Sequence, residues 1–83
     1  MLPMAQAELD EAITSLVKRK YPRLKLTHED MSEWLLGSEC HTASVNAACL
    51  RLMKTRQLDR DGAGVAHDPF TYKPWCEPFE RRI

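Results

Sequence analysis

The chain has 83 residues, a formal net charge of zero and an apolar content of 43%. These values predict one small globular domain, and they exclude a disordered chain and a nucleic-acid binder that relies on a large positive net charge. The cations are unevenly spread, since residues 18–25 hold five basic residues and no acid. A neutral total is therefore compatible with one basic face.

Three cysteines stand at positions 40, 49 and 76, and no two of them form a CxxC pair. Their odd number and their spacing predict reduced thiols in an intracellular protein, with no disulfide framework and no zinc site. Because no signal peptide and no membrane-spanning run is recognisable, we expect a cytoplasmic protein without membrane contact. Phosphate-binding loops and paired carboxylates are not recognisable either, and the adjacent Cys40 and His41, a possible nucleophile and base, lie in a predicted turn of a domain too small for a pocket. We therefore expect a protein that is not an enzyme and needs no cofactor or metal.

Two helices are predicted in the first half of the chain. The first covers about residues 5–21 and ends at Pro22, because the residue before a proline is pushed out of the helical region. Residues 23–26 alternate polar and apolar side chains and fit either a short strand or an extended linker. The second helix runs from about His28 to Leu36, with Thr27 and Gly37 as its caps. Its inner face is expected to hold Met31, Trp34 and Leu35.

The third predicted helix begins near His41, is capped by Thr42 and ends near Arg56. Its apolar stripe follows the helical spacing and consists of Val45, Ala48, Cys49 and Leu52. The other face carries Asn46, Ala47, Leu50, Arg51 and Lys54, and no acid occurs between Glu39 and Asp59. Hydrogen-bond donors without acids are what a helix in the DNA major groove needs. A core helix with a solvated basic face is the alternative.

Two short strands are predicted after this helix, at residues 57–60 and 70–73. The turn between them begins with Asp61-Gly62-Ala63-Gly64, and Pro74 ends the second strand. The remaining residues, 75–83, form a tail. Its aromatic residues Trp75 and Phe79 are expected to pack on the domain or on a protein partner.

This order of elements resembles the winged helix-turn-helix superfamily over roughly residues 8–75. The inward positions typical of that superfamily are occupied here by Val45, Ala48, Cys49, Leu52 and Leu58. Arg56 stands where a glycine often precedes the wing strand, and Cys49 stands where leucine is usual. The resemblance implies an α+β, mainly α fold: a three-helix winged helix-turn-helix with a C-terminal two-stranded β-hairpin wing. The single domain would cover residues 1–83, with its core at about 5–75 and a tail at 76–83.

The resemblance also implies a small sequence-specific DNA-binding protein, similar to transcriptional regulators and excisionases of phage, plasmid or bacterial type. The helix at about 42–55 would enter the major groove, and two copies would bind double-stranded DNA as a homodimer or side by side. The DNA-binding residues would be Thr42, Ser44, Asn46, Ala47, Arg51, Lys54 and Arg60, with Asn46 reading adenine. Asp59, Asp61 and Asp68 would lie close to phosphates in the wing, which is unfavourable.

The alternative function is a protein-interaction module with the same fold and no DNA binding, for example a phage-encoded inhibitor of a host protein. The neutral charge, the acidic wing and the aromatic tail favour it. The two functions predict different surfaces. A continuous basic face over Arg51, Lys54, Arg60 and residues 18–25 would favour DNA, and an apolar patch around Leu50, Trp75 and Phe79 would favour a protein partner.

Overall fold

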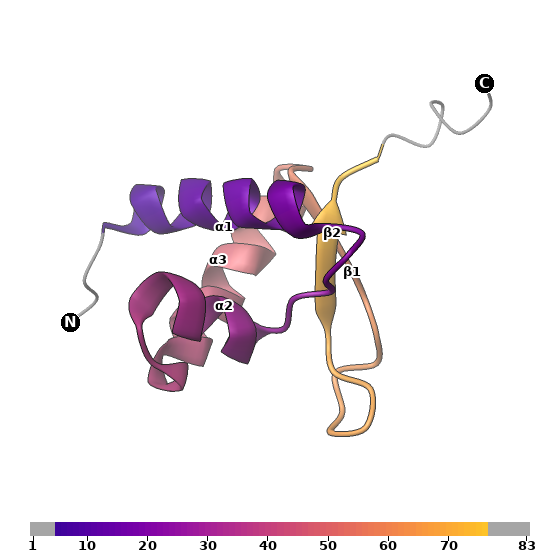
Figure 1. Cartoon of the computed structure of the whole chain (residues 1–83). Helices are drawn as coiled ribbons and strands as arrows, with labels where there is room; N and C mark the ends of the chain where they lie inside the picture. The colour runs from indigo at the N-terminus through magenta and orange to yellow at the C-terminus, as the bar shows by residue number, and fades with distance from the viewer. Residues whose placement is uncertain (1–4, 77–83) are drawn as a thin grey trace.

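The computed structural model describes residues 5–76, which fold into three α-helices and one two-stranded antiparallel sheet (Figure 1). In chain order the elements are α1 (Gln6–Lys20), α2 (His28–Leu36), the short 3₁₀ helix η1 (Glu39–His41), α3 (Thr42–Lys54), β1 (Leu58–Asp61) and β2 (Thr71–Pro74). The expected α+β, mainly helical class is confirmed. Figure 1 shows the hairpin standing at one side of the three helices.

Helix α1 buries one face against α2 and α3. The buried side chains are those of the predicted stripe, Leu9, Ile13, Leu16 and Val17. Acidic residues lie near its first turn and basic residues in its last turn, an arrangement that stabilises the helix dipole. The helix ends at Lys20, and the Tyr21–Pro22 peptide bond that follows is cis.

Helix α2 begins and ends where the sequence predicted. Thr27 and Asp30 form a capping box, in which each side chain accepts a hydrogen bond from the other's backbone N–H at 3.2 Å. Gly37 ends the helix with φ at 74°, a backbone angle that glycine adopts without strain. The prediction that Trp34 belongs to the core is wrong, because its side chain is 50% exposed. This short helix buries only the sector around Met31, and Trp34 lies outside that sector.

Helix α3 packs against both α1 and α2. Its predicted stripe is confirmed, since Val45, Ala48, Cys49 and Leu52 are all at most 2% exposed. The helix ends in a Schellman motif: the N–H of Arg56 donates to the Met53 carbonyl, and the N–H of Gln57 donates to the Leu52 carbonyl. Arg56 has a φ of 61° and thus adopts the left-handed conformation that usually belongs to glycine.

The hairpin pairs β1 with β2 in the register Leu58↔Pro74 to Asp61↔Thr71. Leu26, between α1 and α2, forms an isolated bridge with Tyr72, whose N–H donates to the Leu26 carbonyl at 3.2 Å. The segment at residues 23–26 therefore contributes one strand-like residue to the edge of the sheet. Leu26, Leu58 and Tyr72 are all buried and belong to the same hydrophobic core as the buried side chains of the helices. The sheet therefore covers one side of that core.

Candidate nucleic-acid interface

The outward face of α3 is determined by the face that it buries. Because the stripe from Val45 to Leu52 points into the core, the residues on the opposite side of the helix are left exposed. They are Ala43, Ala47, Leu50 and Lys54, and the half-buried Asn46 lies at the edge of this face. The Leu50 side chain is 46% exposed, although leucine usually lies inside small domains. This outward face contains no acid.

Two polar side chains on this face and at its edge form no hydrogen bond within the described residues. The amide of Asn46 is half-buried, and the ammonium of Lys54 is exposed. Within residues 5–76, neither side chain has a hydrogen bond or ion-pair partner. Of the residues expected to bind DNA, Asn46 and Lys54 thus have unpartnered side chains in the described part of the chain, and Ala47 is exposed on the same helix.

Arg51 is placed differently, because its guanidinium turns toward α1. Its Nη2 donates to Asp10 Oδ1 at 2.7 Å and its Nε donates to Asp10 Oδ2 at 3.2 Å. This bidentate pair raises the pKa of Arg51 above its ordinary value, first through the hydrogen bond with Asp10. The guanidinium expected to contact phosphate is thus bound within the domain.

The prediction that Thr42 caps α3 is wrong, because Thr42 already has helical backbone angles and continues directly from η1. The N-cap residue of α3 is His41, and no side chain caps this helix; the hydroxyl of Ser38 instead caps η1, where it accepts a hydrogen bond from the N–H of Cys40. Thr42 and Ser44 lie half-buried in the first turn of α3.

A residue that sequence reasoning missed fixes the turn between α2 and α3. The buried hydroxyl of Ser32 donates to the Ser38 carbonyl and accepts from the N–H of His41 at 3.1 Å. The available signal was its spacing, since Ser32 stands three and four residues before Leu35 and Leu36 and therefore shares their side of the helix. Ser32 holds the turn and therefore the direction in which α3 leaves α2.

The β1–β2 hairpin with its loop at residues 62–70, called the wing here, forms contacts between its own charged side chains and other groups of the hairpin. The guanidinium of Arg60 stacks on the Phe70 ring at 3.8 Å from the ring centroid, so this cation lies against the wing. Asp61 pairs with Lys73 at 3.1 Å. Asp59 and Asp68 accept hydrogen bonds from wing backbone N–H groups, at 2.8 Å and 3.1 Å. These three carboxylates therefore have structural roles within the wing.

A polar cluster that the sequence did not reveal links α2, α3 and the sheet. The Tyr72 hydroxyl lies 2.5 Å from His28 Nε2 and also interacts with Cys49 and Arg60. Burial raises the pKa of the Cys49 thiol and that of the Tyr72 phenol to about 12 each. Burial, together with the nearby Arg60 charge, lowers the pKa of His28. The cluster connects the wing to the helices.

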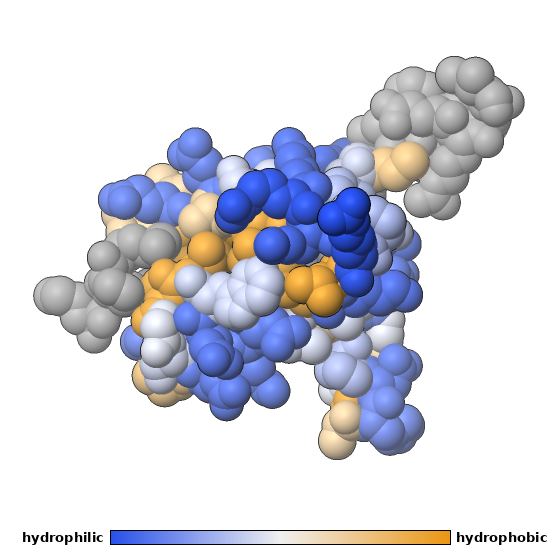
Figure 2. All heavy atoms as spheres, in the orientation of Figure 1, coloured by the Kyte–Doolittle hydropathy of each residue, from blue (hydrophilic) through white to orange (hydrophobic). Residues whose placement is uncertain are grey.

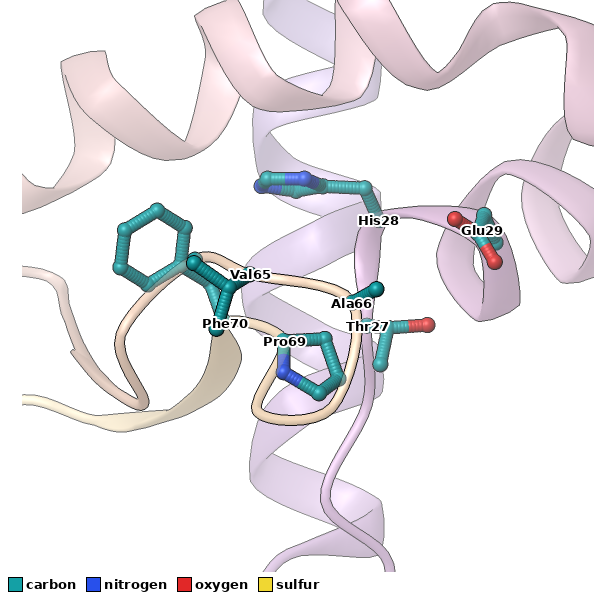
Figure 3. Close-up of a pocket in the computed structure, with 8 residues that line it drawn as sticks. Thr27, His28, Glu29, Val65, Ala66, Pro69 and Phe70 are labelled. Carbon is teal, nitrogen blue, oxygen red and sulfur yellow. The ribbon is translucent and has the colours of Figure 1, made fainter.

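An open cavity of about 330 Å³ lies between the first turn of α2 and the wing loop (Figure 3). Figure 3 shows the His28 ring extending over the loop, with Phe70 at one end of the cavity and Glu29 at the other. The hydroxyl of Thr27 is already used in the capping box and His28 already contacts Tyr72. Because few free polar groups converge on it, the cavity supports no cofactor assignment.

The basic run at residues 18–25 does not extend the outward face of α3. In Figure 2 the most hydrophilic surface gathers over the C-terminal half of α1, whereas Figure 1 shows α3 behind α1 and α2 in the same view. The Lys20 ammonium lies 5.3 Å from the centroid of the Trp34 ring, on α2. Within residues 5–76 the cations are thus divided among separate surfaces, and the continuous basic face expected for DNA is interrupted there.

The tail is described only as far as residue 76. Trp75 is half-buried, and its backbone N–H donates to the Gln57 carbonyl. Phe79 lies outside the described residues. Among residues 5–76, no three metal-binding side chains lie close enough together to hold a metal ion, and no helix has the length and apolar character to cross a membrane.

Comparison with known proteins gives no relative. No family model matches the chain, and no curated protein or solved structure matches it.

Proposed function

We propose that this chain is a small sequence-specific DNA-binding protein of the winged helix-turn-helix class, and that α3 enters the major groove. The observation that carries the proposal is the outward face of α3. It has no acid, and it presents the free amide of Asn46 and the free ammonium of Lys54 beside small and apolar side chains. These are the groups that contact base edges and phosphates.

The arrangement of the elements supports this proposal. Helix α2, the turn held by Ser32 and helix α3 follow one another as in a helix-turn-helix, and the hairpin lies beside them with Leu26 bridged to its edge. Of the three wing acids, Asp61 is paired with Lys73, whereas Asp59 and Asp68 accept only backbone hydrogen bonds and keep their charge. We therefore expect the wing to lie beside the DNA with little contact to phosphates.

The corresponding biological role is that of a transcriptional regulator. One α3 helix offers few donors, so a single domain would bind weakly and with little specificity. Two copies on neighbouring half-sites, as a homodimer or side by side, would raise both affinity and specificity.

The test titrates the full chain into a fluorescently labelled, random-sequence DNA duplex about two helical turns long. Binding is measured as the increase in fluorescence anisotropy of the duplex. We expect binding that weakens steeply between about 50 and 200 mM salt. Lys54→Gln is expected to reduce the slope of log K against log salt by about one, as for the loss of one phosphate contact. Lys20→Gln, on a separate surface, is the matched control and should leave the slope unchanged. Absence of binding at low salt would refute the proposal.

A second function, a protein-interaction module, is favoured by one observation. The outward face of α3 is more apolar than basic, because Leu50 is 46% exposed while Arg51 and Arg60 are bound within the domain. Exposed apolar side chains on an unpartnered helix are typical of protein-binding surfaces. This function becomes the preferred one if the chain binds no DNA at low salt.

A further inference from the structure

We propose that α3 recognises A·T-rich DNA, with Leu50 contacting thymine methyl groups and Asn46 pairing with adenine. This inference rests on the proposed DNA-binding function and assigns its base preference.

The proposal begins with a row of three residues at intervals of four along α3. Asn46, Leu50 and Lys54 present an amide, an apolar group and a cation along one side of the helix. Four residues of α-helix rise about 6 Å, so neighbouring members of the row are separated by roughly two base-pair steps of about 3.4 Å. One helix can therefore place the amide and the apolar group over base pairs about two steps apart in one groove.

Leu50 is the member of the row that the fold does not explain. Its side chain is 46% exposed and adds nothing to the core, which is already filled by the opposite stripe. In the major groove, the 5-methyl group of thymine is the apolar feature of the base edges, and apolar side chains recognise it. The exposed Ala47, on the same face as Leu50, allows close approach to the groove.

Asn46 supplies the complementary contact. Its amide has a donor and an acceptor, and neither has a partner within residues 5–76. This pair of groups matches the N7 acceptor and N6 donor of adenine. Asn46 also lies in the first half of α3, and the N-terminal part of a recognition helix is the part nearest to the bases.

Guanine recognition is disfavoured by the same geometry. Guanine is read by a bidentate arginine or lysine, and the arginine of α3, Arg51, instead forms its bidentate pair with Asp10. Lys54 lies at the last residue of the helix, where contact with a phosphate is favoured. The outward face therefore combines groups that fit adenine and thymine and lacks a free arginine for guanine.

The experiment compares three duplexes of equal length by anisotropy at low salt: alternating A·T, alternating A·U and alternating G·C. Uracil keeps every hydrogen-bonding group of thymine and lacks only the 5-methyl group, so the comparison isolates the apolar interaction. We expect binding to A·T to be about fivefold or more tighter than to G·C. Binding to the A·T duplex should also be about threefold to fourfold tighter than binding to the A·U duplex for each thymine methyl group that Leu50 contacts.

Two variants assign these preferences to residues. Leu50→Ala should abolish the difference between thymine and uracil, and Asn46→Ala should reduce the preference for A·T over G·C. Leu24→Ala is the matched control, because Leu24 is 45% exposed outside α3 and should leave both preferences intact. Equal binding to all three duplexes would overturn the inference while leaving DNA binding in place. No binding to any duplex would overturn the DNA-binding function as well, and the face would then belong to a protein partner.

Discussion

Arg51 on α3 and Asp10 on α1 form a bidentate ion pair that fastens the candidate recognition helix to the first helix of the domain. The two residues are far apart in sequence, and both side chains remain partly exposed, at 37% and 25%. The sequence predicted that Arg51 contacts DNA. The structure instead gives its guanidinium a partner inside the protein.

We expect this pair to contribute a small and measurable coupling to stability. Arg51→Gln, Asp10→Asn and the double variant should show a coupling free energy of about 0.5–1 kcal/mol in urea unfolding, since solvent screens a partly exposed pair. Asn46→Ala combined with Asp10→Asn is the control cycle and should be additive, because the Asn46 amide has no hydrogen-bond partner within residues 5–76 and thus no contact with Asp10 to lose. Strictly additive effects of the two single variants would show that the pair does not stabilise the protein.

Arg56→Gly should stabilise the protein. Arg56 has a φ of 61° in the Schellman motif that ends α3, and a side chain with a β-carbon is strained there. Removing the strain outweighs the extra freedom of glycine in the unfolded chain, so we expect a gain of about 0.5–1 kcal/mol by thermal or urea unfolding.

Arg56→Ala separates this backbone effect from loss of the charge. It removes the guanidinium but keeps the β-carbon, so it should give no comparable gain. If alanine stabilised the protein as much as glycine, the effect would come from the side chain and the strain argument would be wrong.

The helices and the hairpin were predictable because their signals are local. Apolar spacing located α1 and α3, and Thr27 and Gly37 marked the ends of α2. The glycine position that Arg56 fills was also visible in the sequence, and the structure shows the glycine-like backbone there.

The rest depends on interactions between segments distant in sequence, and local patterns do not encode these. The burial of Ser32, the pairing of Arg51 with Asp10 and the stacking of Arg60 on Phe70 all follow from how the elements pack. The sequence therefore led us to expect DNA contacts from Arg51 and Arg60, whereas the fold gives both guanidinium groups partners within the domain.

The exposure of Trp34 can be tested against the burial of Met31. Met31 is fully buried, so Met31→Ala should cost about 2–5 kcal/mol, because it removes apolar packing and leaves a cavity. Trp34→Ala should cost about 1 kcal/mol, because half of the ring is already in water and the variant removes only its buried edge and its interaction with Lys20. Equal destabilisation in urea unfolding would place Trp34 in the core, as the sequence alone suggested.

The pH dependence of stability should report on His28. In the folded protein its pKa is lowered from 6.5, first by burial and then by the positive charge of Arg60, while Glu29 opposes the shift. The unfolded chain therefore takes up the proton at higher pH than the folded chain does. The stabilisation is complete above pH 6.5 and is lost as the pH falls below 6.5 and through the lowered pKa.

The measurement is the free energy of unfolding in urea at a series of pH values between about 5 and 8, the range over which histidine changes its charge. The wild-type protein should lose stability toward the acidic end, and His28→Gln should lose less because it has no group to protonate beside Tyr72. His67→Gln is the matched control, because His67 is exposed on the wing loop and should retain the wild-type profile. If His28→Gln and the wild-type protein lost stability in parallel across this range, the acid sensitivity would belong to other groups, and the contact between His28 and Tyr72 would be a structural hydrogen bond without a titrating role.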